Sequence, residues 1–168
     1  MRINLPNGLT IARILMVPLM VIAFYLPFRG TNLIAAAMFT IAAITDWLDG
    51  YLARRYQQTS DFGAFLDPVA DKLAVTVALF LIVQADKTAL MAVTAAIIVG
   101  REITISALRE WMAAIGERTK VGVAWLGKVK TVVQMVALGF LLYREPLLGL
   151  PIFQIGEWLL AAAALLTL

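Results

Sequence analysis

The sequence contains neither cysteine nor histidine, and only 15% of its residues are charged. Without cysteine no disulfide or thiolate chemistry is available, and without histidine there is no Ser-His-Asp triad and no imidazole ligand for a metal. Carboxylates remain as the natural acid–base groups. The chain is instead rich in apolar residues, with 62% hydrophobic residues and a mean hydropathy of +0.88, well above an ordinary soluble domain. Its 168 residues predict a single domain, residues 1–168, in a lipid bilayer.

Six apolar segments approach or exceed the length of about 20 residues that a helix needs to cross a bilayer. They cover residues 9–28, 32–56, 67–84, 88–113, 121–143 and 147–168. A spanning helix satisfies its own backbone hydrogen bonds in lipid, so the sequence predicts an all-α integral membrane bundle of six transmembrane helices. A short N-terminal interfacial segment is expected before the first span, where Pro6, Asn7 and Gly8 should resist regular helix. No cleavable signal peptide is expected, because polar residues follow Arg2.

The basic residues predict an orientation. With six spans both chain ends lie on one side of the membrane, and 11 of the 14 Lys and Arg residues fall on that side. Only Arg29, Lys87 and Arg144 fall on the other. By the positive-inside rule both termini face the cytoplasm.

Four carboxylates lie inside or beside the apolar segments: Asp46, Asp49, Asp67 and Asp71. Ionisable groups in such segments are costly and usually face a cavity or a partner. On helices the first two are i and i+3 and the last two are i and i+4, so each pair shares a face. Two helices that each offer such a pair would form an all-oxygen site for a hard divalent cation, which often binds together with phosphate. The alternative is that these aspartates cap helices or pair with Arg54 and Arg55.

Further polar residues follow in the fourth and fifth segments. A polar stripe at i, i+4 and i+7 is formed by Glu102, Ser106 and Arg109. Basic groups facing the carboxylates would suit a second anion, such as the phosphate of a small acceptor. In the alternative interpretation, Arg101 and Glu102 form an ion-pair network that only joins helices. For Lys130, a charge at the membrane interface is the preferred interpretation.

The pattern D-x-x-D-G-x-x-A-R, eight residues, G-x-x-x-D-x-x-x-D in residues 46–71 resembles the signature of the CDP-alcohol phosphatidyltransferases at every defined position. Residues 101–112 and 127–135 are similar to bacterial members whose acceptor is glycerol 3-phosphate. The resemblance implies transfer of a phosphatidyl group from CDP-diacylglycerol to glycerol 3-phosphate, which gives phosphatidylglycerophosphate and CMP. The alternatives are a sibling transferase that uses serine or inositol phosphate, and a divalent-cation transporter. The surplus of basic groups favours a phosphorylated acceptor, and the clustering of polar groups in the cytoplasmic half argues against a transporter.

The resemblance also implies roles for individual residues. The four aspartates would hold two Mg²⁺ or Mn²⁺ ions, and Asp71 would also accept the proton of the attacking hydroxyl. The residues implied to bind CDP-diacylglycerol are Asn7, Thr10, Arg13, Gly50, Ala53, Arg54, Ser60 and Gly63. Those implied for the acceptor phosphate are Arg101, Arg109 and Lys128.

Two of these assignments have competing interpretations. The stretch with Thr10 and Arg13 can instead be an interfacial anchor, with Arg13 extending to the headgroups. Ser60 can be a solvated loop residue. The resemblance further implies a homodimer in the bacterial inner membrane, with its active site facing the cytoplasm and no nucleic-acid partner.

Overall fold

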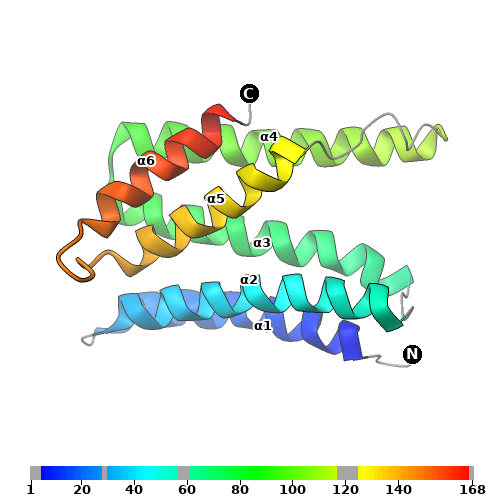
Figure 1. The fold of residues 1–168 in the computed structure, drawn as a ribbon, viewed down its shortest axis with the longest axis horizontal. Helices are drawn as coiled ribbons and strands as arrows, with labels where there is room; N and C mark the ends of the chain where they lie inside the picture. The colour runs from blue at the N-terminus through cyan, green and yellow to red at the C-terminus, as the bar shows by residue number, and fades with distance from the viewer. Residues whose placement is uncertain (1–4, 28–29, 57–60, 117–124, 167–168) are drawn as a thin grey trace.

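The computed structural model describes the backbone of residues 5–27, 30–56, 61–116 and 125–166. Side chains are described for residues 8–27, 30–46, 48, 65–116, 127 and 129–166. In these described ranges six helices follow one another: α1 (Leu5–Tyr25), α2 (Thr31–Tyr56), α3 (Asp61–Asp86), α4 (Ala89–Ala114), α5 (Trp125–Tyr143) and α6 (Ile152–Leu165) (Figure 1). Within these ranges the chain forms no strand beyond one isolated bridge between Leu147 and Leu150. The predicted all-α fold and its six helices are confirmed.

Several helix ends differ from the prediction, and the largest differences are at the starts of α1, α3 and α6. α3 begins at Asp61 instead of residue 67. α1 already begins at Leu5, so Pro6 lies in its first turn, where the missing N–H of proline costs no hydrogen bond. The expectation that this stretch resists regular helix was therefore wrong. α6 begins only at Ile152, because Leu148 (φ 53°) and Gly149 (φ 80°) form a tight turn that no α-helix can contain.

The helices pack so that α4 and α5, which follow each other in the chain, stay apart. α1 lies beside α2 and α3, α2 also meets α5, and α5 pairs with α6. α4 meets α3 and α6, but within the described ranges none of its Cα atoms comes within 8 Å of a Cα atom of α5. Figure 1 shows the C-terminal half of α4 running past the start of α5. The space between these two helices is where the candidate site lies.

α5 and α6 approach each other closely at Gly156. A Cβ atom at this position would lie 2.9 Å from Cγ of Leu141 and 3.2 Å from the carbonyl oxygen of Ala137. Such contacts are shorter than normal van der Waals separation, so glycine is what permits this distance between the helices. Small residues play this part at many contacts between membrane helices.

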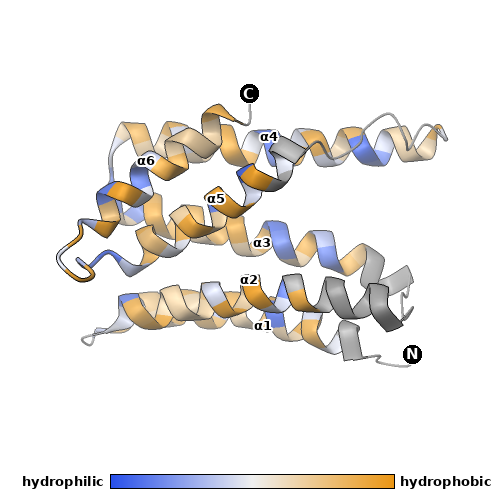
Figure 2. Cartoon of the chain, in the orientation of Figure 1, coloured by the Kyte–Doolittle hydropathy of each residue, from blue (hydrophilic) through white to orange (hydrophobic). Residues whose placement is uncertain are grey.

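Two helical segments among the described residues, Gly8–Tyr25 and Ala89–Ala114, are long and apolar enough to cross a membrane. Shorter apolar segments lie in α2, α5 and α6, and charges interrupt the apolar stretch of α3 in its first half. Large apolar side chains also point outward, including Phe80 (63% exposed), Leu90 (68%) and Trp158 (78%). Figure 2 shows apolar residues along most of the described part of every helix, with polar ones set among them, several within α1, α3 and α4. These features are those of a membrane protein.

Candidate active site

Two polar side chains of α1 reach the acidic residues of α2 and α3. The hydroxyl of Thr10 donates a hydrogen bond to Oδ1 of Asp67, with an O–O distance of 2.6 Å. The guanidinium of Arg13 forms an ion pair with Oδ1 of Asp46. Both α1 residues are buried, with 1% of Thr10 and 2% of Arg13 exposed. α1 therefore holds one carboxylate of each half of the acidic motif.

Burial of Arg13 decides between the two interpretations of this stretch. An anchor that extends to headgroups would have an exposed guanidinium, whereas the side chain of Arg13 lies inside the protein and faces a carboxylate. A buried charge is stable only with such a partner. The anchor interpretation was wrong for Arg13. The side chain of Asp46 stays 41% exposed, so its carboxylate remains open to a ligand.

Asp71 connects this cluster to the rest of the site. It follows Asp67 by one turn of α3, and it is close enough to Asp46 and Glu102 to interact with both electrostatically. No described side chain donates a hydrogen bond to Asp71. One carboxylate of α2 and one of α3 are thus near enough to influence each other.

The donor set suits a hard divalent cation, because its oxygens are carboxylate oxygens and Asp46 is accessible. Among the side chains that the structure describes, no three acidic residues gather closely enough to hold a metal ion. The fourth predicted ligand, Asp49, has a side chain outside the described set. The complete predicted ligand set therefore stays a prediction.

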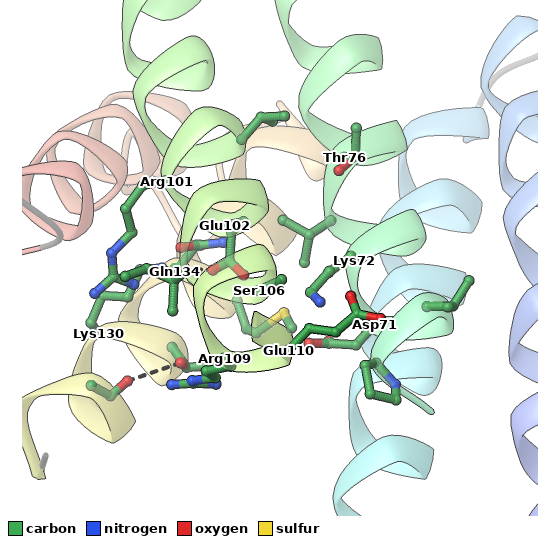
Figure 3. A pocket seen from close by; sticks show the side chains of 18 of the residues that line it. Asp71, Lys72, Thr76, Arg101, Glu102, Ser106, Arg109, Glu110, Lys130 and Gln134 are labelled. Carbon is green, nitrogen blue, oxygen red and sulfur yellow. Dashed lines mark hydrogen bonds and ion pairs between the residues drawn. The ribbon is translucent and has the colours of Figure 1, made fainter. Parts of the chain in front are cut away.

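A cavity of about 890 Å³ opens between α3, α4 and α5. Figure 3 shows the side chains that line it, with Asp71 and Lys72 on α3 facing the polar residues of α4 and α5. Its charged and amide-bearing lining residues are Asp71, Lys72, Arg101, Glu102, Arg109, Glu110, Lys130 and Gln134. The cavity is therefore lined both by Asp71, which belongs to the acidic motif, and by several cationic side chains.

An ion pair joins α4 and α5 in the wall of this cavity. Nζ of Lys130 on α5 lies 2.9 Å from Oε1 of Glu102 on α4. Lys130 is buried, so its interpretation as an interfacial charge was wrong. The alternative interpretation placed Arg101 and Glu102 in an ion-pair network that joins helices. In the structure Glu102 pairs with Lys130, and Arg101 lines the cavity. A charged residue within an apolar helix is compatible with an interior position as well as with the membrane surface, so the sequence alone did not place this residue.

The remaining predicted residues divide into two groups. Of those implied for the acceptor phosphate, Arg101 and Arg109 both line the cavity, and Arg109 lies toward its exposed side. The other predicted residues fall outside the described side chains: Asn7, Asp49, Gly50, Ala53, Arg54, Ser60, Gly63 and Lys128. Lys72 and Gln134 were not among the predicted site residues, yet both line the cavity.

The fold and site define a class: an all-helical protein in which carboxylates on consecutive helices border a cavity lined by cations. Residues 3–168 match the family model of the CDP-alcohol phosphatidyltransferases. The chain belongs to this family.

Three similar proteins carry the name CDP-diacylglycerol–glycerol-3-phosphate 3-phosphatidyltransferase. The chain is 56% identical to that of Haemophilus influenzae over 144 residues, which cover 86% of this chain and 78% of the relative. It is 51% identical to that of Pectobacterium atrosepticum over 167 residues, covering 99% and 90% of the two chains. It is 49% identical to that of Salmonella typhimurium over 168 residues, covering 100% and 91%.

Proposed function

We propose that this protein transfers the phosphatidyl group of CDP-diacylglycerol to glycerol 3-phosphate and releases CMP. The observation that carries the proposal is the cavity in which Asp71 faces Arg101, Arg109 and Lys130. This chamber offers a proton acceptor for a hydroxyl and cations for a phosphate, the two functional groups of this acceptor. The names of relatives at about half identity support the same donor and acceptor.

The chain's own groups would serve the reaction as follows. The acceptor hydroxyl oxygen attacks the β-phosphorus of the donor, the bond from that phosphorus to the CMP oxygen breaks, and Asp71 accepts the hydroxyl proton. Arg101 and Arg109, together with Lys128, hold the acceptor phosphate. The nucleotide end is bordered by the residues implied above: Asn7, Gly50, Ala53, Arg54, Ser60 and Gly63.

Thr10 and Arg13 have a more specific part in this proposal. Their contacts with Asp67 and Asp46 support a role in orienting these two carboxylates. Asp46, Asp49, Asp67 and Asp71 would hold two Mg²⁺ or Mn²⁺ ions, which supply charge neutralisation at the pyrophosphate when bound. A fixed rotamer of each ligand keeps such a site in its productive geometry.

We also propose that all six helices cross a bacterial inner membrane and that both termini and the cavity face the cytoplasm. The outward apolar side chains and the distribution of basic residues support this placement. In this arrangement the single domain, residues 1–168, acts as a homodimer without nucleic acid. A cation transporter is the weaker candidate, because the family and all the relatives named above are transferases.

The test uses purified protein in detergent with CDP-diacylglycerol and Mg²⁺, and it measures CMP release for glycerol 3-phosphate, serine and inositol phosphate. We expect release with glycerol 3-phosphate alone, and none after removal of the metal with EDTA. CMP release with serine or inositol phosphate and not with glycerol 3-phosphate would assign a sibling activity. No release with any acceptor would refute the proposal.

A further inference from the structure

Lys72 is a cationic residue of the cavity wall to which the proposed reaction gives no part. It lies on α3 directly after Asp71, and its side chain is partly buried. Consecutive residues of a helix do not face each other, so Lys72 is not simply the counter-ion of Asp71. Figure 3 shows its side chain extending from α3 toward α4. The charge of Lys72 is therefore directed into the cavity.

The position of Lys72 places it on the acceptor side of the site. Of the described carboxylates of the acidic motif, Asp46 and Asp67 contact α1 and do not line the cavity, whereas Asp71 lines it together with Lys72. In the proposed reaction the carboxylates beside α1 hold metal ions at the donor pyrophosphate. The cavity beyond Asp71 is then the space for the acceptor, and Lys72 lies in the wall of that space.

Cations line this space from two helices. Arg101 and Arg109 lie on α4, and Lys72 lies on α3. Lys130 on α5 also lines the cavity, but Glu102 balances its charge. A phosphate group offers three acceptor oxygens that point in different directions. A phosphate between α3 and α4 can therefore bind cations of both helices at once.

We propose that Lys72 binds the phosphate of the acceptor from α3, opposite Arg101 and Arg109, and thereby helps to select a phosphorylated alcohol. This inference rests on the proposed function. Lysine suits the position because its ammonium is a compact charge on a flexible chain and binds a phosphate oxygen without a fixed geometry. Because Lys72 follows Asp71 in the chain, the bound phosphate keeps the acceptor hydroxyl close to the carboxylate that accepts its proton.

The first experiment measures the steady-state kinetics of CMP release for wild-type protein, Lys72→Met and Lys72→Arg, with Lys87→Met as the matched control. Lys87 is an exposed lysine directly after α3, outside the cavity. We expect Lys72→Met to raise KM for glycerol 3-phosphate about 10- to 100-fold, the usual loss for a hydrogen bond to a charged group. The KM for CDP-diacylglycerol should not change. Lys72→Arg keeps the charge and should restore most of the affinity for the acceptor.

The second experiment measures binding without catalysis, as the change in Tm on addition of glycerol 3-phosphate in the absence of CDP-diacylglycerol. A ligand that binds only the folded protein raises its Tm. We expect this rise in wild-type protein, Lys87→Met and Lys72→Arg, and a much smaller one in Lys72→Met. Glycerol at the same concentration should have no effect on any of the four proteins, because it has the hydroxyls of the acceptor without the phosphate.

Each outcome has a distinct meaning. An unchanged KM for glycerol 3-phosphate in Lys72→Met would overturn the role of Lys72. A rise in the KM for CDP-diacylglycerol instead would assign Lys72 to the donor pyrophosphate and would also overturn it. If Lys72→Met does not fold, Lys72→Gln takes its place, and loss of folding in both would assign Lys72 a structural role. A wild type whose Tm rises with glycerol 3-phosphate but that releases no CMP would instead refute the proposed function.

Discussion

The ion pair between Lys130 and Glu102 permits a sharp prediction, because its two partners are buried to different extents. The side chain of Lys130 is 3% exposed and that of Glu102 is 32% exposed, with 2.9 Å between Nζ and Oε1. In Glu102→Leu the ammonium stays buried without its carboxylate, which costs about 3–5 kcal/mol of unfolding free energy. In Lys130→Met the carboxylate left behind is partly hydrated, and we expect a smaller loss of about 1–3 kcal/mol.

The double variant Glu102→Leu/Lys130→Met removes both charges together. Replacement of a buried ion pair by apolar residues is often neutral or stabilising, by about 1–4 kcal/mol. The double variant should thus be at least as stable as the wild type. Of the two single variants, which should both be less stable than the wild type, Glu102→Leu should be the less stable. The coupling between the two sites is large because the residues touch.

Thermal unfolding in detergent, followed by the fluorescence of the four tryptophans, measures this order. For a chain of this size about 1 kcal/mol corresponds to a shift in Tm of about 2–4 °C, so Glu102→Leu should unfold at least 6 °C below wild type. Glu145→Leu, at an exposed acidic residue of the α5–α6 connection, is the control and should change stability by no more than about 0.5 kcal/mol. If Lys130→Met is the less stable single variant, the asymmetry of burial does not govern this pair and the reasoning fails.

Three further predictions concern catalysis, packing and topology. Asp71→Asn should abolish CMP release while CDP-diacylglycerol binding stays measurable by calorimetry; full activity would remove Asp71 from the proton-acceptor role. Gly156→Ala should lower the Tm although alanine favours helix, because the added Cβ would lie 2.9 Å from Cγ of Leu141 on α5. The control Gly100→Ala should not lower the Tm, because no atom lies within 4 Å of its Cβ. Equal effects of the two substitutions would refute the close contact. Because the chain has no cysteine, Lys87→Cys and Ile115→Cys each give one site for labelling. In inverted membrane vesicles, whose cytoplasmic face points outward, only the cysteine at residue 115 should react with an impermeant maleimide. Labelling at residue 87 instead would show that the proposed orientation is wrong.

The helices were predictable because each contains an apolar segment bounded by polar residues. The prediction of α2 as residues 32–56 agrees with Thr31–Tyr56, and that of α4 as 88–113 agrees with Ala89–Ala114. The approach of α2 to α3 was also predictable, since paired carboxylates on consecutive helices are costly unless they share a polar site.

The contacts of individual cations were not predictable from the sequence. A lysine within an apolar helix can reach the membrane surface or turn inward, and both choices have the same periodicity. Lys130 turns inward because α4 stands away from α5 and places Glu102 across the gap. Such a gap is a property of how three helices pack together, and no single helix carries a signal for it. For the same reason Gln134 gave no indication of its position beside a cavity.

The arrangement of the three described aspartates separates two tasks that a single carboxylate performs poorly. A residue that positions a ligand must be held in one rotamer, and the contacts of Arg13 and Thr10 hold Asp46 and Asp67 in this way. A residue that accepts a proton must keep lone pairs free for it, and among the described residues no side chain donates a hydrogen bond to Asp71. Because Asp71 also lies at the wall of the cavity, the proposed mechanism assigns proton acceptance to this carboxylate. In that mechanism the same motif on two helices supplies oriented and reactive groups, and the difference between them comes from the side chains of α1.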